Sequence, residues 1–212
     1  MSKPLSISVE GCDVAGKSTS VAMLKELLEA KGHKVAVLRG MGTGELGEVV
    51  RAKLFSGYIS ERLSATACCL ALLDHYDHVQ KLLASGHTVI NDRSIGTYYA
   101  YNVKANQDLG AEELYSNILN NPAIIDRQPD LVFFIDVTAE EARARLEKIK
   151  DEREISAIDL SPIEYYQDVI AGFYEYFMME RYLPMVRIHN NQDLAHLKKG
   201  LEEGLATLAF KD

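Results

Sequence analysis

Five short runs of apolar residues along the chain predict the strands of a buried sheet. They cover residues 5–10, 34–38, 87–91, 131–136 and 185–189. Each run is almost continuously apolar, which is typical of parallel strands that are covered on both faces. A half-exposed antiparallel sheet would alternate apolar and polar positions instead. The pattern therefore favours a parallel sheet between two layers of helices.

Helical patterns separate these runs, so strands and helices alternate along the chain. The predicted helices cover 17–31, 60–84, 138–150, 161–182 and 193–208, and a further helix carries Arg51. Gly32 is a candidate C-terminal cap, and Thr138 with Glu141 has the spacing of a capping box. The sequence predicts an α/β fold: a doubly wound, five-stranded parallel sheet flanked by helices. We expect a single domain over 1–212, with a short mobile lid insertion at 147–161.

Composition narrows the classes of protein that fit the chain. Among 212 residues, 23 Lys and Arg face 31 Asp and Glu, a formal net charge of -8, so no nucleic-acid partner is expected. The three cysteines lack metal-ligand spacing and suit a reducing compartment. No signal peptide is recognised, and no apolar run approaches about 18 residues. We therefore expect a cytoplasmic protein with no membrane partner.

The strongest motif joins the first apolar run to the first predicted helix. The stretch Gly11-Cys-Asp-Val-Ala-Gly-Lys-Ser18 fits G-x-x-x-x-G-K-[ST], a loop whose backbone N–H groups turn inward around phosphates. No Asn-Lys-x-Asp guanine reader follows, which argues against a GTPase. The expected cofactors are ATP and Mg²⁺, because Lys17 can reach the β- and γ-phosphates and the Ser18 hydroxyl can ligate the metal. The residues expected around the nucleotide are Gly11, Asp13, Val14, Ala15, Gly16, Lys17, Ser18 and Thr19.

Further charged residues fit the second substrate of a phosphoryl transfer. Asp92 ends the third apolar run, where a carboxylate can hold Mg²⁺ through water, and Arg93 beside it can bind phosphate. Arg39 and Arg51 flank a glycine-rich stretch and form a candidate second phosphate site. The alternative for Asp92 and Arg93 is a capping carboxylate and a surface arginine.

A basic stretch at the predicted insertion has two interpretations. Its cations are Arg143, Arg145, Lys148, Lys150 and Arg153. One interpretation is an ordinary solvated helix face. The other is a lid that closes over the transferred phosphoryl group and excludes water, which would otherwise accept it.

These motifs, in this order, resemble those of thymidylate kinases, a family of P-loop nucleoside-monophosphate kinases. The family's V/I-E-G-x-[ED]-x-A-G-K-[ST]-T fits residues 9–19, and R-E-P-G-G-T-x-x-G-E-x-[IL]-R aligns without a gap to 39–51. D-R-[YF]-x-x-S-x-x-A-Y-Q is similar to 92–102, and P-D-L-x-x-x-[LI]-D-V to 129–137. The resemblance covers nearly the whole chain. It implies an ATP-dependent enzyme that converts dTMP to dTDP, and a homodimer paired through its long helix, 60–84.

The resemblance also implies roles for single residues. Asp13 would face the sugar 3′-hydroxyl, and Tyr101 would exclude a ribose 2′-hydroxyl. Val14 occupies the position where some members carry a catalytic arginine, so the lid residue Arg153 becomes the candidate for that cation. The implied catalytic residues are Lys17, Asp92, Arg93 and Arg153. Ser18 and Asp92 would hold Mg²⁺, and Arg145 would stack on adenine. Arg51 and Arg93 would bind the acceptor phosphate, Thr97 and Asn102 would reach toward the base, and Arg39 and Tyr98 are further candidate substrate residues.

The departures from the family pattern fall at the base end of the site. Met41 replaces a proline, and in the block F-[AS]-A-x-R-x-x-H the stacking Phe is Ala71 and the base-reading Arg is His75. A shift by one turn would let Tyr76 supply an aromatic face, and His75 would otherwise be a residue of the helix surface. The preferred base could then differ, for example in a 5-modified acceptor such as 5-hydroxymethyl-dUMP. A further alternative is a regulatory protein that binds ATP without turnover.

Overall fold

The computed structural model describes residues 3–108, 110–120, 128–149, 161–180 and 183–208. It contains one sheet of five parallel strands in the order β2-β3-β1-β4-β5. The strands are β1 (Ser6–Glu10), β2 (Val35–Leu38), β3 (Thr88–Asp92), β4 (Leu131–Asp136) and β5 (Met185–His189). The helices are α1 (Lys17–Ala30), η1 (Gly40–Gly42), α2 (Gly44–Phe55), α3 (Glu61–Ala84), α4 (Ile95–Tyr98), η2 (Tyr99–Ala105), α5 (Ala111–Leu119), α7 (Ala139–Ile149), α8 (Ile163–Met179) and α9 (Leu194–Thr207).

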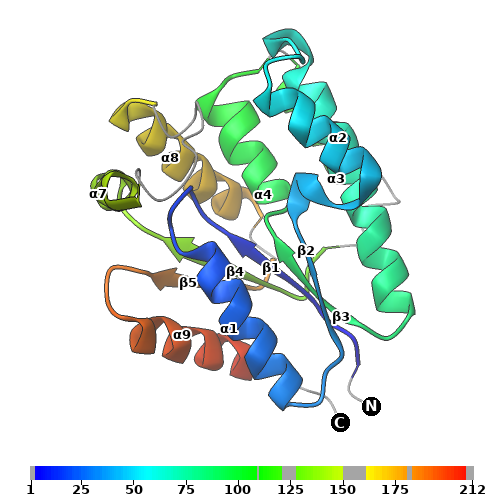
Figure 1. Cartoon of the computed structure of the whole chain (residues 1–212), viewed down its shortest axis with the longest axis vertical. Coiled ribbons are helices and arrows are strands. Elements are labelled where there is room, and N and C mark those ends of the chain that lie inside the picture. The colour runs from blue at the N-terminus through cyan, green and yellow to red at the C-terminus, as the bar shows by residue number, and fades with distance from the viewer. Residues whose placement is uncertain (1–2, 109, 121–127, 150–160, 181–182, 209–212) are drawn as a thin grey trace.

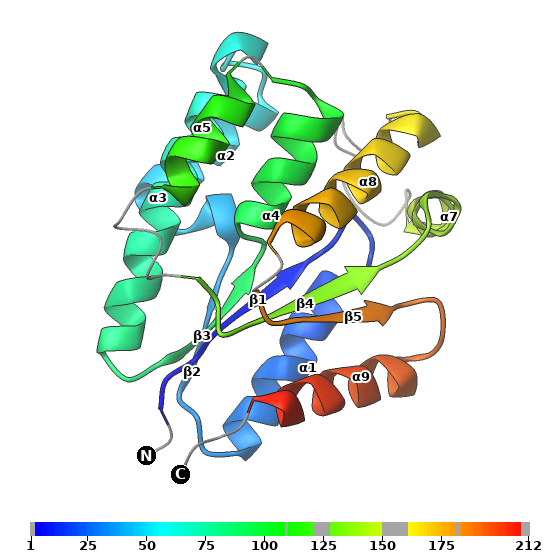
Figure 2. The ribbon, with the colours of Figure 1, turned by 180° about the vertical axis from the view of Figure 1, so that it is seen from behind.

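Helices cover both faces of the sheet, which confirms the predicted doubly wound α/β fold. Figure 1 shows α1 and α9 together on one face and α3, α4 and α8 on the other, and the reverse view in Figure 2 agrees. All five predicted strands are present, with ends within one residue of the expected ones. The central strands β1 and β4 are buried along their whole length. The outer strands β2 and β5 are only partly buried, because each lies at the rim of the helix layers.

The register brings the carboxyl ends of the strands to one edge of the sheet. Val9 of β1 pairs with Asp92 of β3 and with Phe133 of β4. Asp136 at the end of β4 pairs with His189 at the end of β5. The loops that follow these strands therefore meet at one edge, where open α/β sheets bind their ligands.

The helix ends follow the local chemistry of the sequence. The Thr138 N–H donates to Glu141 Oε2 at 2.8 Å, and the Glu141 N–H donates to Thr138 Oγ1 at 3.2 Å, so the predicted capping box is present. Gly32 follows α1 with a φ of 84°, as expected for a left-handed cap. The predicted lid falls almost wholly on 150–160, outside the described residues. None of the described helices is long and apolar enough to cross a membrane.

A second hydrophobic cluster, rich in tyrosine, supports the elements that follow β3. It packs side chains of α3, α4, η2, α5 and α8, and the rings of Tyr99 and Tyr115 lie 4.8 Å apart. Gly172 of α8 lets this helix approach η2, since a Cβ there would lie only 2.8 Å from the Ala100 Cα. The cluster thus fixes η2, whose Tyr101 reaches the carboxyl edge of the sheet.

Candidate active site

The loop between β1 and α1 adopts a conformation that two glycines make accessible. Gly11 and Gly16 have φ values of 149° and 103°. A Cβ on Gly11 would lie 2.4 Å from the Ile135 carbonyl oxygen, and one on Gly16 would lie 2.4 Å from Asn190 Nδ2. The loop is therefore pressed against the ends of β4 and β5. Its backbone and the N-terminus of α1 form a cradle suited to phosphate.

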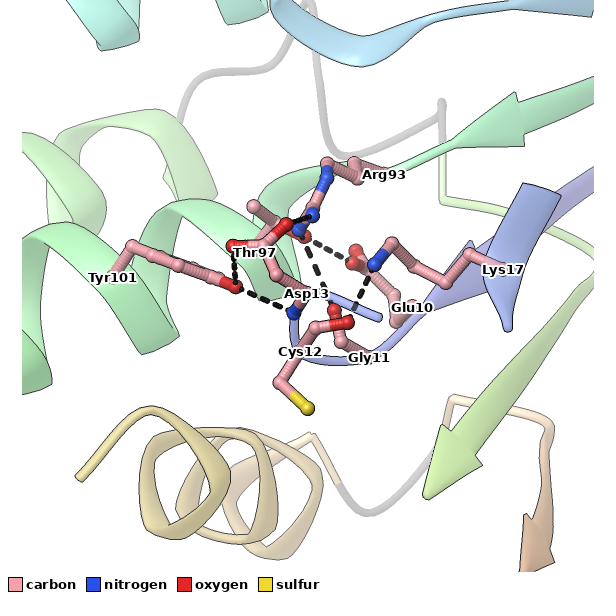
Figure 3. Close-up of polar contacts among 8 residues, drawn as sticks. All are labelled: Glu10, Gly11, Cys12, Asp13, Lys17, Arg93, Thr97 and Tyr101. Atoms are coloured by element: carbon pink, nitrogen blue, oxygen red, sulfur yellow. Dashed lines mark hydrogen bonds and ion pairs between the residues drawn. The ribbon is translucent and has the colours of Figure 1, made fainter. Parts of the chain in front are cut away.

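Lys17 begins α1 and points back into this loop (Figure 3). Its side chain is buried, and Nζ donates to the Cys12 carbonyl oxygen at 2.6 Å. Burial and the neighbouring Arg93 cation lower the pKa of Lys17 to about 8. Phosphate oxygens would restore the charged form by adding negative charge. Ser18 and Thr19, the next two residues, are exposed at the first turn of α1.

Asp13, Arg93 and Tyr101 form a polar cluster beside the loop (Figure 3). The Arg93 guanidinium pairs with the Asp13 carboxylate and donates to the Gly11 carbonyl oxygen at 3.4 Å. The Tyr101 hydroxyl donates to Asp13 Oδ2 at 2.9 Å. Burial works to lower the pKa of Arg93, but Asp13, Tyr101 and Asp92 together more than offset it and raise that pKa above its usual value. Arg93 has a φ of 78°, and such backbone strain is typical of functional sites.

Glu10 connects the end of β1 to α4, a contact that was not predicted from the sequence. Its buried carboxylate accepts hydrogen bonds from the Ser94 N–H at 3.0 Å, the Ser94 hydroxyl at 2.7 Å and the Thr97 hydroxyl at 2.5 Å. Burial raises the pKa of Glu10. Thr97 therefore lies beside the loop, with its hydroxyl directed to Glu10.

Asp92 ends β3 with one buried oxygen, Oδ1, that has no hydrogen-bond partner within the described part of the chain. Its carboxylate acts electrostatically on Lys17 and on Arg51. A buried, unmatched acceptor beside a phosphate cradle fits a hydrated Mg²⁺ bound with a nucleotide. The exposed Ser18 hydroxyl is the second oxygen ligand that the chain offers. The donor set present therefore fits Mg²⁺.

Three arginines gather where the loop after β2 meets the end of β3. A Cβ on Gly42 would lie 3.6 Å from Cδ of both Arg39 and Arg51. Burial, together with the positive charges of Arg39 and Arg93, lowers the pKa of Arg51. Cations that disfavour one another in this way attract an anion strongly. The structure thus brings the three predicted acceptor-phosphate residues together.

The residues predicted to read the base are more buried than their roles suggest. Ala71 and His75 are both 0% exposed, so the alternative that His75 lies on the helix surface is wrong. The Tyr98 hydroxyl donates to the Ala65 carbonyl oxygen at 3.3 Å, inside the tyrosine-rich cluster. Asn102 Nδ2 donates to Asp108 Oδ2 at 2.8 Å. Met41 is partly buried against the same cluster. Contacts between these five residues and a bound base remain predictions.

Arg145 and Asn190 hold the phosphate loop from the other side. Arg145 donates to the Ala15 carbonyl oxygen at 3.1 Å and to the Asn190 carbonyl oxygen. Asn190 Nδ2 donates to the same Ala15 oxygen at 2.6 Å. Asn190 was not predicted, although its place directly after β5 is a signal for this edge. Arg153, the predicted lid cation, lies outside the described residues.

A phosphate cradle on a parallel sheet of this order, facing an arginine cluster, defines a P-loop phosphotransferase with an anionic acceptor. A sequence model of the thymidylate kinase family matches residues 9–196. The chain is 32% identical over 182 residues to the thymidylate kinase of Chlorobaculum parvum, covering 79% of this chain and 80% of that protein. It is 30% identical over 182 residues to the thymidylate kinase of Bacillus velezensis, covering 84% and 83%. The chain belongs to the thymidylate kinase family.

Proposed function

We propose that the protein transfers the γ-phosphoryl group of ATP to dTMP and releases dTDP and ADP. One observation carries the proposal beyond family membership: Asp92 lies within electrostatic reach of both Lys17 and Arg51. Asp92, the carboxylate proposed to hold Mg²⁺, would then serve both the donor cradle and the acceptor arginines. This arrangement suits phosphoryl transfer, because its catalysis is mainly positioning and charge neutralisation.

The residues divide the reaction between donor and acceptor. Lys17 and the loop N–H groups would hold the ATP phosphates, and Arg93 with Arg39 and Arg51 would hold the phosphate of dTMP. An oxygen of that phosphate attacks the γ-phosphorus in line, ADP leaves, and no covalent enzyme intermediate forms. Ser18 and Asp92 would hold Mg²⁺, which supplies neutralisation of the charge on the transferred group.

The sugar and the adenine fall to residues on either side of this centre. The Tyr101 hydroxyl forms hydrogen bonds with both the backbone N–H and the carboxylate of Asp13 in the phosphate loop. This supports the proposed roles of Asp13 beside the 3′-hydroxyl of the acceptor sugar and of Tyr101 at its 2′ position. Arg145 lies against the loop backbone at Ala15, which supports its place at the adenine. Arg153 remains the proposed lid cation.

Replacing Lys17 or Arg93 with alanine tests the assignment. Each substitution should lower dTMP-dependent ADP release by at least about 100-fold, because each removes a cation that neutralises the transferred or acceptor phosphate. Thermal unfolding and circular dichroism would verify that the variants are folded. Near-normal turnover in either folded variant would contradict the site.

We also propose a cytoplasmic homodimer. Leu63 and Leu70 of α3 are 59% and 47% exposed, and Val49 of the adjacent α2 is 57% exposed. Apolar side chains on two packed helices support a shared surface between copies. Other apolar residues of the helix expected to pair, including Ala71 and Leu72, are buried within the chain instead. Light scattering on the purified protein would decide the oligomeric state.

A further inference from the structure

His75 lies inside the protein and is tied to the loop that precedes α2. Its Nδ1 lies 2.9 Å from the Thr43 hydroxyl, a contact that joins residues 32 positions apart. His75 is 0% exposed and Thr43 is 4% exposed. A hydrogen bond so well shielded from water keeps one geometry, because breaking it would leave a buried polar group unpaired.

Asn91 lies on the other side of the His75 ring and bears on which ring nitrogen carries the proton. Nε2 of His75 and Oδ1 of Asn91 are both buried, with no hydrogen-bond partner of ordinary geometry in the described part of the chain. Burial lowers the pKa of His75 to about 4, and the nearby Asn91 side chain acts in the opposite direction to raise it. Asn91 Nδ2 already donates to Ser6 Oγ, so Oδ1 of Asn91 is the atom that could accept from a protonated Nε2. The neutral ring then accepts the Thr43 hydroxyl proton at Nδ1.

Asn91 anchors this chain of contacts in the centre of the sheet. It lies in β3 and pairs with Ser8 of β1. Its Nδ2 donates to Ser6 Oγ at 3.1 Å and to the Ile7 carbonyl oxygen at 3.4 Å. Thr43, His75 and Asn91 therefore connect the loop after β2 to the rigid strand beside the phosphate cradle.

Thr43 holds the segment that carries the acceptor arginines. Gly42 before it lies close to the side chains of Arg39 and Arg51, since a Cβ there would lie 3.6 Å from Cδ of each. Gly44 after it packs on α3, since a Cβ there would lie 2.6 Å from His78 Cε1. Thr43 is also the N-cap residue that directly precedes α2, and α2 carries Arg51. Moving Thr43 would therefore move the arginine cluster.

We propose that His75 is a positioning residue of the acceptor site, which holds Thr43 and through it Arg39 and Arg51, and that it does not touch the base. The proposal rests on the proposed function, because the arginines bind the acceptor phosphate only if the protein is a monophosphate kinase. It changes the predicted role of His75 from recognising the base to orienting the loop after β2, which carries the arginines of the acceptor phosphate.

The chain offers a matched control for removing the Thr43–His75 bond. Thr88 and His33 form a second buried threonine–histidine contact, also 2.9 Å long. Thr88 begins β3, at the end of the sheet opposite to the site. Thr43→Val and Thr88→Val each remove one such hydroxyl without changing the shape of the side chain. Thr43→Ser keeps the hydroxyl and serves as the rescue.

Steady-state kinetics with ATP and dTMP distinguish a role of His75 in positioning the acceptor loop from a role in recognising the base. Thr43→Val should raise the KM for dTMP about tenfold, in line with the loss of one buried hydrogen bond, and leave the KM for ATP within about twofold. Thr43→Ser and Thr88→Val should leave both KM values near those of the unaltered protein. An unchanged KM for dTMP in Thr43→Val, or an equal rise in Thr88→Val, would overturn the proposal. So would a His75→Asn variant that alters the ratio of dTMP to dUMP turnover while keeping the KM for dTMP.

Hydrogen exchange provides a readout that does not depend on activity. Thr43→Val should speed the exchange of backbone amides over 40–50, and Thr88→Val should not. If the unaltered protein phosphorylates no monophosphate, the proposed function fails, and hydrogen exchange alone decides whether His75 positions this segment. Equal protection of 40–50 in both variants would show that it does not.

Discussion

Single side chains set the shape of the phosphate cradle, and Asn190 is the one that the sequence motif does not include. Its amide donates to the Ala15 carbonyl oxygen at 2.6 Å, and its own carbonyl oxygen accepts from Arg145. The Ala15 carbonyl oxygen of the loop also accepts from Arg145, so Asn190 and Arg145 hold the same point of the loop. Asn190 thereby helps to fix the loop that would hold the phosphates.

Asn190→Ala should raise the KM for ATP about tenfold and leave the KM for dTMP nearly unchanged, because one buried hydrogen bond to the donor loop is lost. The neighbouring Asn191 is exposed, so Asn191→Ala is the matched control. Initial-rate measurements with each substrate varied in turn would check this. A rise confined to the KM for dTMP would contradict the role given to Asn190.

The local motifs allowed Lys17, Asp92 and Arg93 to be predicted, since each belongs to a short pattern whose chemistry needs that residue type. Glu10 and Asn190 were missed because their partners are 84 and 175 positions away along the chain. The burial of His75 could not be predicted either. Its face of α3 becomes internal only when the loop at Thr43 folds over it.

At the scale of elements, the contact between α8 and η2 determines where Tyr101 lies. Gly172 makes the contact close, because a Cβ there would meet the Ala100 Cα at 2.8 Å and the Lys104 Cβ at 3.0 Å. Tyr101 on η2 donates to Asp13, so a displacement of η2 would reach the substrate side of the cradle. The rigidity of the tyrosine-rich cluster thus serves the site.

Gly172→Ala should lower the free energy of unfolding by about 1–3 kcal/mol, because backbone atoms of η2 cannot yield to the added methyl group. It should also raise the KM for dTMP through the displaced Tyr101. The neighbouring Ala171 is exposed, and Ala171→Ser is the control. Urea unfolding and initial rates would test both effects. An unchanged or increased stability would show that η2 adapts.

The strands could be predicted because a buried parallel strand needs a continuous apolar run. The segment 95–105 could not be predicted as helical. It contains a glycine and several aromatic and β-branched residues, which have weak helix propensity, and it forms helical turns because α8 and α3 pack around it. The helical conformation of this segment therefore depends on tertiary packing rather than on local helix propensity.

At the scale of the whole molecule, the strand order gathers chemistry that is scattered along the sequence. Glu10, Asp92, Asp136 and His189 end four strands, and the sheet brings these ends to one edge. The phosphate loop, the acceptor arginines and the loop after β5 meet there as a result. The fold could be predicted from the alternation of strands and helices, whereas the distances within the site required the structure.

The central claim is that this edge transfers a phosphoryl group from ATP to dTMP. The most direct test measures ADP release with ATP, Mg²⁺ and a panel of acceptors: dTMP, dUMP, 5-hydroxymethyl-dUMP, dCMP, dGMP, dAMP and their ribose forms. We expect the highest kcat/KM for dTMP, with the ribose forms weaker because Tyr101 is fixed beside Asp13. A different preferred acceptor, or no acceptor-dependent release of ADP, would contradict the account.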